Sequence, residues 1–397
     1  MSITYKKSGV DYGLMDPLKR MAQEAGKKTV INLISSDMKE LPQSRGESAY
    51  VIDSGDSYLA FVMEGLGTKN LVADEMRKIT GKTYYDIMAN DTIGCMVNDI
   101  VTVGAKPVTI MAYWAPGSSE WFKDIKRQKD LVNGWAKACN LSGASWGGGE
   151  TPTLTKIVSK ETIDLAGACF GLIKPKSRLI LGDKLEAGDV VILFESNGIH
   201  ANGLSLARLV AKKLPRTYAT KMPNGEMFGE ALLKPTILYP KLIMDLLDSG
   251  IEIHYISNIT GHGWRKIMRL KKPFTYRITA IPPVPEVLKF IVDQGKIDLK
   301  EAYGNFNMGA GFAVYVPEKE AQKVLKIASK HKIKAYKAGV VEKGEKQVII
   351  EPLNITYKSE ELNIRACLET YDKLSSRARY ERGNPAGSRI TQRDCFG

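Results

Sequence analysis

The chain lacks the features of membrane proteins and of disulfide-stabilised proteins. No window of its 397 residues approaches the roughly 18 consecutive apolar residues that a membrane-spanning helix needs. Residues 1–7 lack the apolar core of a secretion signal. The five cysteines are scattered and odd in number, and none forms a Cys-x-x-Cys pair, which argues against a disulfide framework or a zinc site. These absences predict a protein of the reducing cytoplasm, without a membrane partner.

Several common functional motifs are also absent. Gly81-Lys82-Thr83 is not a Walker A motif, because the first glycine of that motif is missing. The chain has no Gly-x-Gly-x-x-Gly fingerprint, no Gly-x-Ser-x-Gly elbow and no His-Glu-x-x-His pair. The net charge of +13 would attract polyanions, yet no helix-turn-helix, zinc finger or aromatic-basic pattern supports a nucleic-acid partner. A nucleotide site in this chain must therefore use another architecture.

The composition that remains is typical of a globular protein, with 44% hydrophobic and 25% charged residues. The length allows two domains, each with its own core. Apolar runs and amphipathic stretches alternate, which predicts an α/β fold with mixed sheets. Helices are expected at residues 14–26, 70–80, 91–103, 119–141, 202–213, 235–249, 284–294 and 318–331, and strands at 49–53, 58–63, 108–114, 144–146, 163–173, 189–194, 311–316, 335–341 and 346–351.

A polar and basic segment at residues 175–183 separates two apolar strands and predicts a domain boundary. We expect an N-terminal domain at 1–174 and a C-terminal α/β domain at 175–352. Residues 353–397 are expected to form a helix at 358–372 followed by a disordered basic tail.

A glycine turn follows the expected strand that ends near residue 63. Within six positions it contains the carboxylate of Glu64, two glycines, the hydroxyl of Thr68 and Lys69. Glycines allow close approach of the backbone to a ligand, and exposed N–H groups beside a lysine favour phosphate. A neighbouring carboxylate can hold the Mg²⁺ that accompanies it. The alternative is an ordinary strand-to-helix turn with an exposed lysine.

Residues 89–99 place polar groups on one face of an expected helix. Asp91 lies about two helical turns before Asn98 and Asp99, and these three polar residues have apolar neighbours. Buried carboxylates are costly unless they are paired or bound to metal, so this face is a candidate site. The alternative is that Asp91 caps the helix and that Asn98 and Asp99 are exposed.

Four glycine-rich segments follow at 146–152, 196–205, 258–264 and 305–312. The first has three glycines before Glu150, which we interpret as a flexible loop. The second follows a strand and opens a helix, where N–H groups and asparagines can hold an anion. His200 within it suits proton transfer or phosphate contact, although a single histidine is often structural. The last two can serve as turns or as ligand walls.

In this order, the segments resemble the aminoimidazole ribonucleotide synthetase family, also called phosphoribosylformylglycinamidine cyclo-ligases. Residues 5–11 and 65–69 look like its opening and its glycine turn. Asp91 with residues 97–99 and 104–107 looks like its second motif. The series continues at 148–151, 197–203, 234–236, 260–263 and 306–311, so the resemblance spans about residues 4–351.

The resemblance implies a two-domain subunit whose N-terminal domains pair in a homodimer, with ATP in a cleft partly at the subunit interface. It implies ATP-driven ring closure of formylglycinamidine ribonucleotide in purine biosynthesis. The amide oxygen is phosphorylated first, a nitrogen then attacks, and phosphate leaves. The implied cofactors are ATP and Mg²⁺, with K⁺ as a further candidate, and the partners are small-molecule substrates.

The resemblance also implies roles for individual residues. Asp91, His200 and Lys69 are the catalytic candidates. The ATP and phosphate contacts are Gly65, Gly67, Thr68, Lys69, Asn98, Gly148, Gly149 and Thr151; the substrate contacts are Asn197, His200, Asn202, Thr260, Gly261 and Asn307; and the metal ligands are Glu64, Asp91, Asn98 and Glu150.

The chain departs from the family pattern at several positions. Glu64 stands where the family has Asp, Gly304 where it has Arg, and His262 interrupts a run of three glycines, while a glycine-rich loop near the N-terminus is missing. Selenophosphate synthetase, thiamine-phosphate kinase and a catalytically lapsed binding protein stay as alternatives. The first would need a reactive N-terminal cysteine, yet the first cysteine is Cys95.

Overall fold

The computed structural model describes residues 8, 9, 11–362 and 364. The expected tail at 373–397 lies outside the described residues, as do most of the expected helix at 358–372 and most of the opening motif at 5–11. Within the described ranges, none of the helices combines the length and the apolar character that crossing a bilayer requires.

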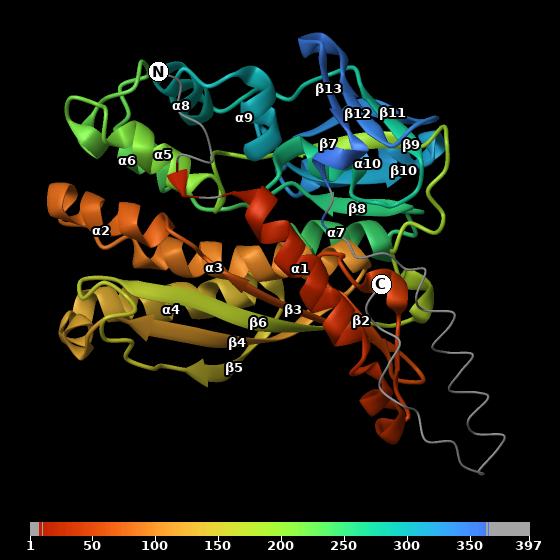
Figure 1. The fold of residues 1–397 in the computed structure, drawn as a ribbon, viewed down its shortest axis with the longest axis horizontal. Coiled ribbons are helices and arrows are strands. Elements are labelled where there is room, and N and C mark those ends of the chain that lie inside the picture. The colour runs from red at the N-terminus through yellow and green to blue at the C-terminus, as the bar shows by residue number, and fades with distance from the viewer. Residues whose placement is uncertain (1–7, 10, 363, 365–397) are drawn as a thin grey trace, which may run out of the picture.

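The first half of the chain forms a six-stranded mixed sheet in the order β1-β2-β3-β6-β4-β5. Pairing is antiparallel except between β4 and β5, which run parallel. Helices α2 and α3 lie between this sheet and the second half of the chain (Figure 1). The elements are α1 (Tyr12–Lys27), β1 (Lys39–Glu40), β2 (Tyr50–Asp53), β3 (Tyr58–Gly65), α2 (Lys69–Thr80), α3 (Tyr85–Ile100), β4 (Lys106–Pro116), α4 (Ile125–Ser142), β5 (Ser145–Glu150) and β6 (Ile163–Ile173).

The second half forms a seven-stranded sheet in the order β13-β12-β9-β11-β7-β10-β8. The chain therefore passes from the first sheet to the second between residues 173 and 190, an interval that contains the predicted boundary. Strand β13 extends the second sheet past residue 352. The elements are β7 (Val190–Glu195), α5 (Leu204–Ala211), α6 (Phe228–Leu232), α7 (Pro240–Asp248), β8 (Tyr255–Asn258), β9 (Phe274–Ile278), α8 (Glu286–Gly295), α9 (Leu299–Asn305), β10 (Ala310–Val316), α10 (Ala321–Lys330), β11 (Ala335–Lys343), β12 (Gln347–Ile350) and β13 (Ile355–Lys358).

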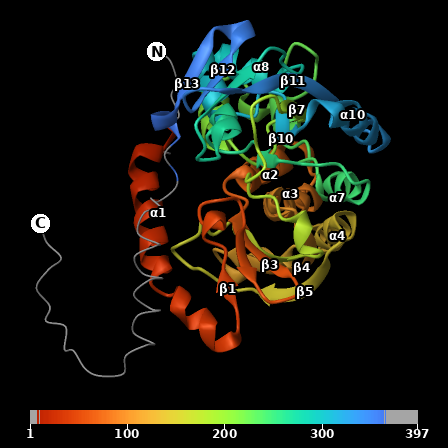
Figure 2. The ribbon, with the colours of Figure 1, turned by 90° about the vertical axis from the view of Figure 1, so that its right-hand side faces the viewer.

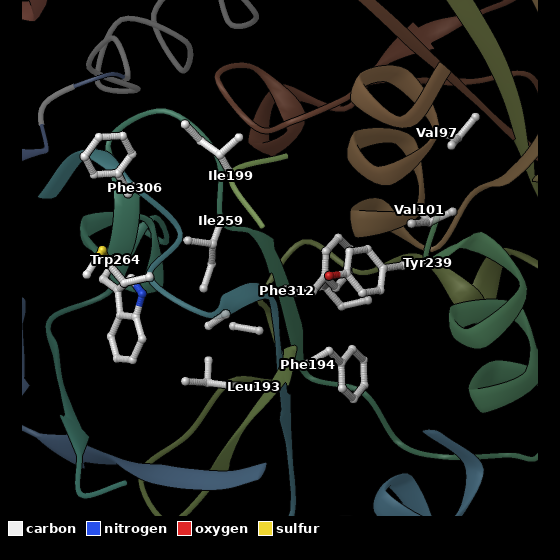
Figure 3. Close-up of a cluster of buried hydrophobic side chains, with 14 of the residues drawn as sticks. Val97, Val101, Leu193, Phe194, Ile199, Tyr239, Ile259, Trp264, Phe306 and Phe312 are labelled. Carbon is white, nitrogen blue, oxygen red and sulfur yellow. The ribbon is translucent and has the colours of Figure 1, made fainter. Parts of the chain in front are cut away.

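These two sheets with their helices confirm the predicted α/β class with mixed sheets. A hydrophobic cluster joins the halves where α3 ends. Val97 and Val101 lie near Tyr239 of the second half in this cluster (Figure 3). The Tyr239 ring stacks on Phe312 with a centroid distance of 4.8 Å. Helix α1 runs along the outside of both halves (Figure 2), and its Tyr12 ring stacks on His262 at 3.7 Å.

Helix α3 begins six residues before the predicted start at residue 91. Its N-cap is Tyr84, with a positive φ of 60°, so Asp91 lies in the middle of the helix and is fully buried. The alternative in which Asp91 caps the helix and Asn98 and Asp99 are exposed is therefore wrong, because both of the latter are buried as well.

The glycines at 147–149 do not form the predicted flexible loop. They continue strand β5, which pairs with β4 as far as Glu150. A Cβ at Gly149 would lie 2.2 Å from the carbonyl oxygen of Ala112, so only glycine allows this approach of the two strands. The prediction was wrong because a run of glycines has two explanations. It can form a loop, or it can lie in a strand where a neighbouring backbone comes too close for a side chain.

Candidate functional site

The polar face of α3 binds the backbone of the segment that precedes α7. One carboxylate oxygen of Asp91 accepts the N–H of Thr236 at 2.6 Å. Asn98 donates to the carbonyl of Ile237 at 2.8 Å and accepts the N–H of Tyr239 at 2.9 Å. Both α3 side chains are buried. Their hydrogen bonds join the two halves, and either residue would have to give some of them up to bind a metal.

Lys69 is fully buried at the start of α2. Its ammonium pairs with the Asp91 carboxylate. It also donates to the carbonyl oxygens of His200 and Lys234, each at 2.9 Å. An ammonium has three N–H donors, and here each has an acceptor. The structure thus places Lys69 in a link between the halves, with no donor left for a phosphate.

A second group of charges lies nearby and is called here the interdomain charge cluster: Glu64, Asp99, Lys266 and Arg269. Glu64 is the next-to-last residue of β3. Asp99 belongs to α3, where it accepts a hydrogen bond from Asn258 at 2.7 Å. The Glu64 side chain is exposed to solvent on one side. Protein groups nevertheless lie close around its carboxylate and reduce its solvation. Loss of solvation and then the charge of Asp99 raise the pKa of the Glu64 carboxyl to about 7.

Lys266 brings a buried ammonium from the second half to this cluster. It donates to the Thr260 hydroxyl at 2.5 Å. Among the described residues, no ion pair joins it to a carboxylate, although Asp99 and Glu64 are near enough to act on its charge. Burial and then Arg269 lower the pKa of Lys266, while the two carboxylates oppose that shift.

His200 lies in the loop between β7 and α5, with a positive φ of 57°. Its ring is buried, and its Nε2 has no hydrogen-bond partner within the described part of the chain. Burial, and then the charge of Lys69, lower the pKa of His200 to about 3. The imidazole is therefore neutral near pH 7 and offers Nε2 as a hydrogen-bonding group.

A cavity of about 20 Å³ brings several predicted site residues together. Its lining includes Asn98, His200, Asn202, Thr260 and Asn307. This volume holds about one water molecule, so a nucleotide must lie beyond it or open it. The predicted substrate-binding loops thus meet α3 at one place.

Two of the predicted substrate contacts hold the loops themselves. Asn307 accepts from Ser196 at 2.7 Å and donates to the carbonyl of Gly198 at 2.9 Å. Asn197 donates to the carbonyl of Pro235 at 2.9 Å. Gly261 lies beside Tyr12, whose hydroxyl would be 2.7 Å from a Cβ at that glycine. These contacts fix the walls around His200.

The glycine turn is open to a ligand. Gly65 and Gly67 are exposed. Within the described ranges, no atom lies within 4 Å of a Cβ built on Gly67, whose φ of 72° suits glycine. Thr68 precedes α2 and makes no side-chain capping bond. The first N–H groups of this twelve-residue helix are therefore available to an anion.

The structure separates Glu150 from the other predicted metal ligands. Glu150 pairs across the sheet with Tyr113, which pairs with Ala166, which pairs with Gly65. Adjacent residues of a strand face opposite sides, so Glu150 points away from the face that carries Glu64, about 14 Å across three strand spacings. Gly148, Gly149 and Thr151 lie beside Glu150, away from Lys69.

The donor set for a divalent cation can be tested against these contacts. Glu64 and Asp99 fit, because neither carboxylate is in an ion pair with a residue of the described ranges, and loss of solvation followed by the charge of Asp99 raises the Glu64 pKa. Asp91 and Asn98 fit poorly, because protein groups already use their oxygens. A single chain does not bring together the four predicted metal ligands Glu64, Asp91, Asn98 and Glu150. This ligand set stays a prediction.

Another group of metal-ligand residue types lies in the second half, at Glu186, Asp189 and His254. One oxygen of Asp189 already lies 2.7 Å from His254 Nδ1 and accepts the N–H of Glu186 at 3.0 Å. These bonds account for the cluster as a structural one.

Lys266 and Arg269 are site residues that sequence reasoning missed, and Asn258 lies in the segment singled out at 258–264 but was given no role of its own. The signal for Lys266 was a lysine beside the apolar residues Trp264, Ile267 and Met268, immediately after a glycine segment already singled out. A lysine that is buried with a short apolar stretch must find polar partners.

Solved structures share this two-sheet fold. The crystal structure of a HypE–HypF complex aligns with a TM-score of 0.55 at 18% identity, over 79% of this chain and 92% of that chain. AaThiL complexed with AMPPCP and TMP aligns with a TM-score of 0.55 at 15% identity, over 79% and 90%. The fold therefore defines a class of two-domain α/β proteins.

Sequence comparison identifies the family within that class. Residues 46–173 match the family model for "AIR synthase related protein, N-terminal domain", and residues 186–351 match the C-terminal domain model. The phosphoribosylformylglycinamidine cyclo-ligase of Methanobrevibacter smithii is 36% identical over 325 residues, 81% of this chain and 90% of the relative. That of Methanocaldococcus jannaschii is 36% identical over 345 residues, 85% and 92%. The chain belongs to the AIR synthase related family.

Proposed function

We propose that the chain is an ATP-dependent cyclo-ligase that closes formylglycinamidine ribonucleotide to aminoimidazole ribonucleotide in purine biosynthesis. The observation that carries the proposal is the 36% identity to cyclo-ligases over nine-tenths of their length. Relatives of this name align through both halves, so both the glycine turn and the His200 loop lie inside the aligned region. The likeness to AaThiL, at 15% identity, concerns the fold and gives no comparable argument for another activity.

The chemistry asks the chain to hold two anionic ligands and to orient an attacking nitrogen. The open turn at Gly65–Thr68 and the start of α2 would bind phosphate oxygens of ATP. Glu64 and Asp99 would hold Mg²⁺, which supplies charge neutralisation for phosphoryl transfer when it is bound. A nucleotide complex of the structural neighbour AaThiL supports ATP binding within this fold.

His200 would position the substrate beside α3. With a pKa of about 3 the imidazole is a weak base, so its contribution is a hydrogen bond from or to Nε2. The surrounding loops leave room for only about one water molecule, since the cavity at His200 measures about 20 Å³. Asp91 and Lys69 would act at a distance by joining the two halves that carry these groups.

The uncovered face of the first sheet supports a homodimer. Met63 of β3 and Met111 of β4 both pair with Ala168 of β6, so they lie in one row on this face. Phe61 and Phe170 lie in a neighbouring row, with ring centroids 5.5 Å apart. Met63 is 72% exposed and Met111 44%. An apolar patch of this kind is typical of a protein interface, and a partner chain would bring further residues toward Glu150.

The test is turnover with defined substrates. The protein, ATP, Mg²⁺ and formylglycinamidine ribonucleotide should yield ADP and aminoimidazole ribonucleotide in equal amounts. A requirement for ATP fits the expected cytoplasmic location. Replacing K⁺ by Na⁺ in the assay tests whether K⁺ is a further cofactor.

Two histidine variants give the matched comparison. His200→Asn keeps a residue that tolerates positive φ and should lower kcat by about 10- to 100-fold through loss of one hydrogen bond. His331→Ala removes a histidine paired with Asp245 on the surface of the second half and should leave kcat unchanged. ATP consumption without the ribonucleotide, or equal rates in both variants, would contradict the proposal.

A further inference from the structure

Two lysines reach the contact between the halves, and they differ in what their ammonium groups touch. Lys69 has an acceptor for each of its three N–H donors: Asp91, the His200 carbonyl and the Lys234 carbonyl. Among the residues that the structure describes, Lys266 makes one side-chain hydrogen bond, to the Thr260 hydroxyl. Both side chains are buried. A buried ammonium with donors left over is costly unless a ligand or water completes its contacts.

The other cation of the interdomain charge cluster is already engaged. Arg269 donates to the Ser48 hydroxyl at 3.0 Å and to the Gly46 carbonyl at 2.9 Å, and it pairs with Glu47 at 3.3 Å. The contacts of Arg269 thus hold it to the segment at residues 46–48, and its Nε, which lacks a hydrogen-bond partner among the described residues, faces Glu47. Within the described ranges, the Lys266 ammonium has no such carboxylate beside it and is held by one hydroxyl.

The position of Lys266 suits a phosphorylated ligand. Thr260, which it contacts, lines the cavity beside His200 and Asn202. The carboxylates of Glu64 and Asp99, on the half that carries the open glycine turn, are near enough to act on its charge. A ligand between the halves thus meets carboxylates on one side, which suit its metal, and an ammonium on the other.

We propose that Lys266, rather than Lys69, is the lysine that donates hydrogen bonds to a phosphoryl oxyanion of the ligand. This inference rests on the proposed function, since it assumes that a phosphorylated ligand lies between the halves. The donor is already desolvated in the protein, so a charge-assisted bond to an oxyanion is strong there. The oxyanion belongs either to the terminal phosphate of ATP or to the 5′-phosphate of the ribonucleotide.

The experiment compares affinities in the full-length protein. Calorimetry measures the binding of Mg²⁺–ATP, AMP and formylglycinamidine ribonucleotide to the wild type and to Lys266→Met, with Lys266→Gln as a second variant. Lys346→Met is the matched control. Burial lowers the pKa of Lys346, as it does that of Lys266, but Lys346 lies beside β12, outside the charge cluster. The urea midpoint of each variant reports its folding.

Loss of the Lys266 ammonium should weaken one phosphorylated ligand by about 10- to 100-fold. Weaker ATP with unchanged AMP assigns the contact to the terminal phosphates, and weaker ribonucleotide assigns it to the 5′-phosphate. The urea midpoint should stay at or above the wild-type value, because an incompletely paired buried charge is removed. Lys346→Met should leave all three affinities unchanged.

Affinities within about twofold of the wild type in both Lys266 variants would overturn the inference. It would also fail if Lys69→Met, and not Lys266→Met, lost ATP selectively with an unchanged urea midpoint. A wild type that binds both ligands and forms no product would overturn the proposed cyclisation alone, since the affinities still decide the role of Lys266. A wild type that binds neither ligand would overturn both.

Discussion

Replacing Lys69 by methionine should destabilise the protein strongly, since it breaks the link between the two halves. Methionine fills a similar volume but carries no charge, so the Asp91 carboxylate would stay buried without its counterion. Removing one partner of a buried ion pair costs about 3–5 kcal/mol. The carbonyl oxygens of His200 and Lys234 would each lose a donor as well, and a buried group left unsatisfied costs about 1–3 kcal/mol.

These contributions are not additive, because Asp91 keeps the N–H of Thr236 and the amide of Asn90. We therefore expect a loss of at least about 3 kcal/mol in the free energy of unfolding. Urea unfolding, followed by tryptophan fluorescence and by circular dichroism, measures this loss. The first unfolding transition should move to a lower urea concentration.

Lys78→Met on the same helix is the control. Its ion pair with Glu75 is exposed, at 67% and 50% of the two side chains, and such a pair is worth only about 0–1 kcal/mol. Adding Asp91→Asn to Lys69→Met removes the unpaired buried charge and should recover part of the loss. A Lys69→Met protein that unfolds at the same urea concentration as Lys78→Met would refute the reasoning.

Three further predictions follow from the site and the sheets. Loss of solvation by the surrounding protein groups, and then the charge of Asp99, raise the Glu64 pKa from 4.5 to about 7, so ionisation of Glu64 opposes folding as pH rises through that interval. Glu64→Gln should match the wild type in urea midpoint at pH 4 and exceed it at pH 8, and a constant difference would contradict this. Met63→Glu should convert the proposed homodimer to a monomer in sedimentation experiments, because it charges the apolar sheet face; an unchanged mass would remove this face from the proposed interface. Gly149→Ala should lower the free energy of unfolding by about 1–3 kcal/mol, since its Cβ would clash with Ala112; thermal denaturation measures it, and an unchanged midpoint would contradict the close approach.

Most of the fold was predictable from local patterns. Strand β6 spans the predicted residues 163–173, and the apolar runs that became β3, β7 and β10 were recognised because buried strands are short and rich in β-branched and aromatic residues. Strand β9 was missed because its five residues contain Thr275 and Arg277, which weaken the apolar signal.

The start of α3 was misplaced for a different reason. An Asn-Asp pair before an apolar run indicates a helix N-terminus. Here Asn90 and Asp91 instead bind the backbone of Thr236, some 145 residues away in sequence. Local propensity carries no information about such a partner.

The candidate site was predictable only in part. Sequence order identified the segments that meet at His200, since glycine loops and asparagines carry their own signal. It did not show that Lys69 and Asp91 neutralise each other, because that pairing follows from the packing of α2 on α3. Nor did it show that Glu64 and Glu150 face opposite sides of the first sheet, which depends on strand order and register. Lys266 escaped notice because its role depends on which half faces it.

The most direct test of the proposed function follows the amide oxygen of the substrate. Formylglycinamidine ribonucleotide carrying a heavy oxygen isotope in its amide is converted with ATP and Mg²⁺, and the released phosphate is examined by mass spectrometry. Phosphorylation of the amide oxygen before ring closure predicts that the label appears in the phosphate, in amounts equal to the aminoimidazole ribonucleotide formed. Unlabelled phosphate, or ADP formed without the ring-closed product, would contradict the account.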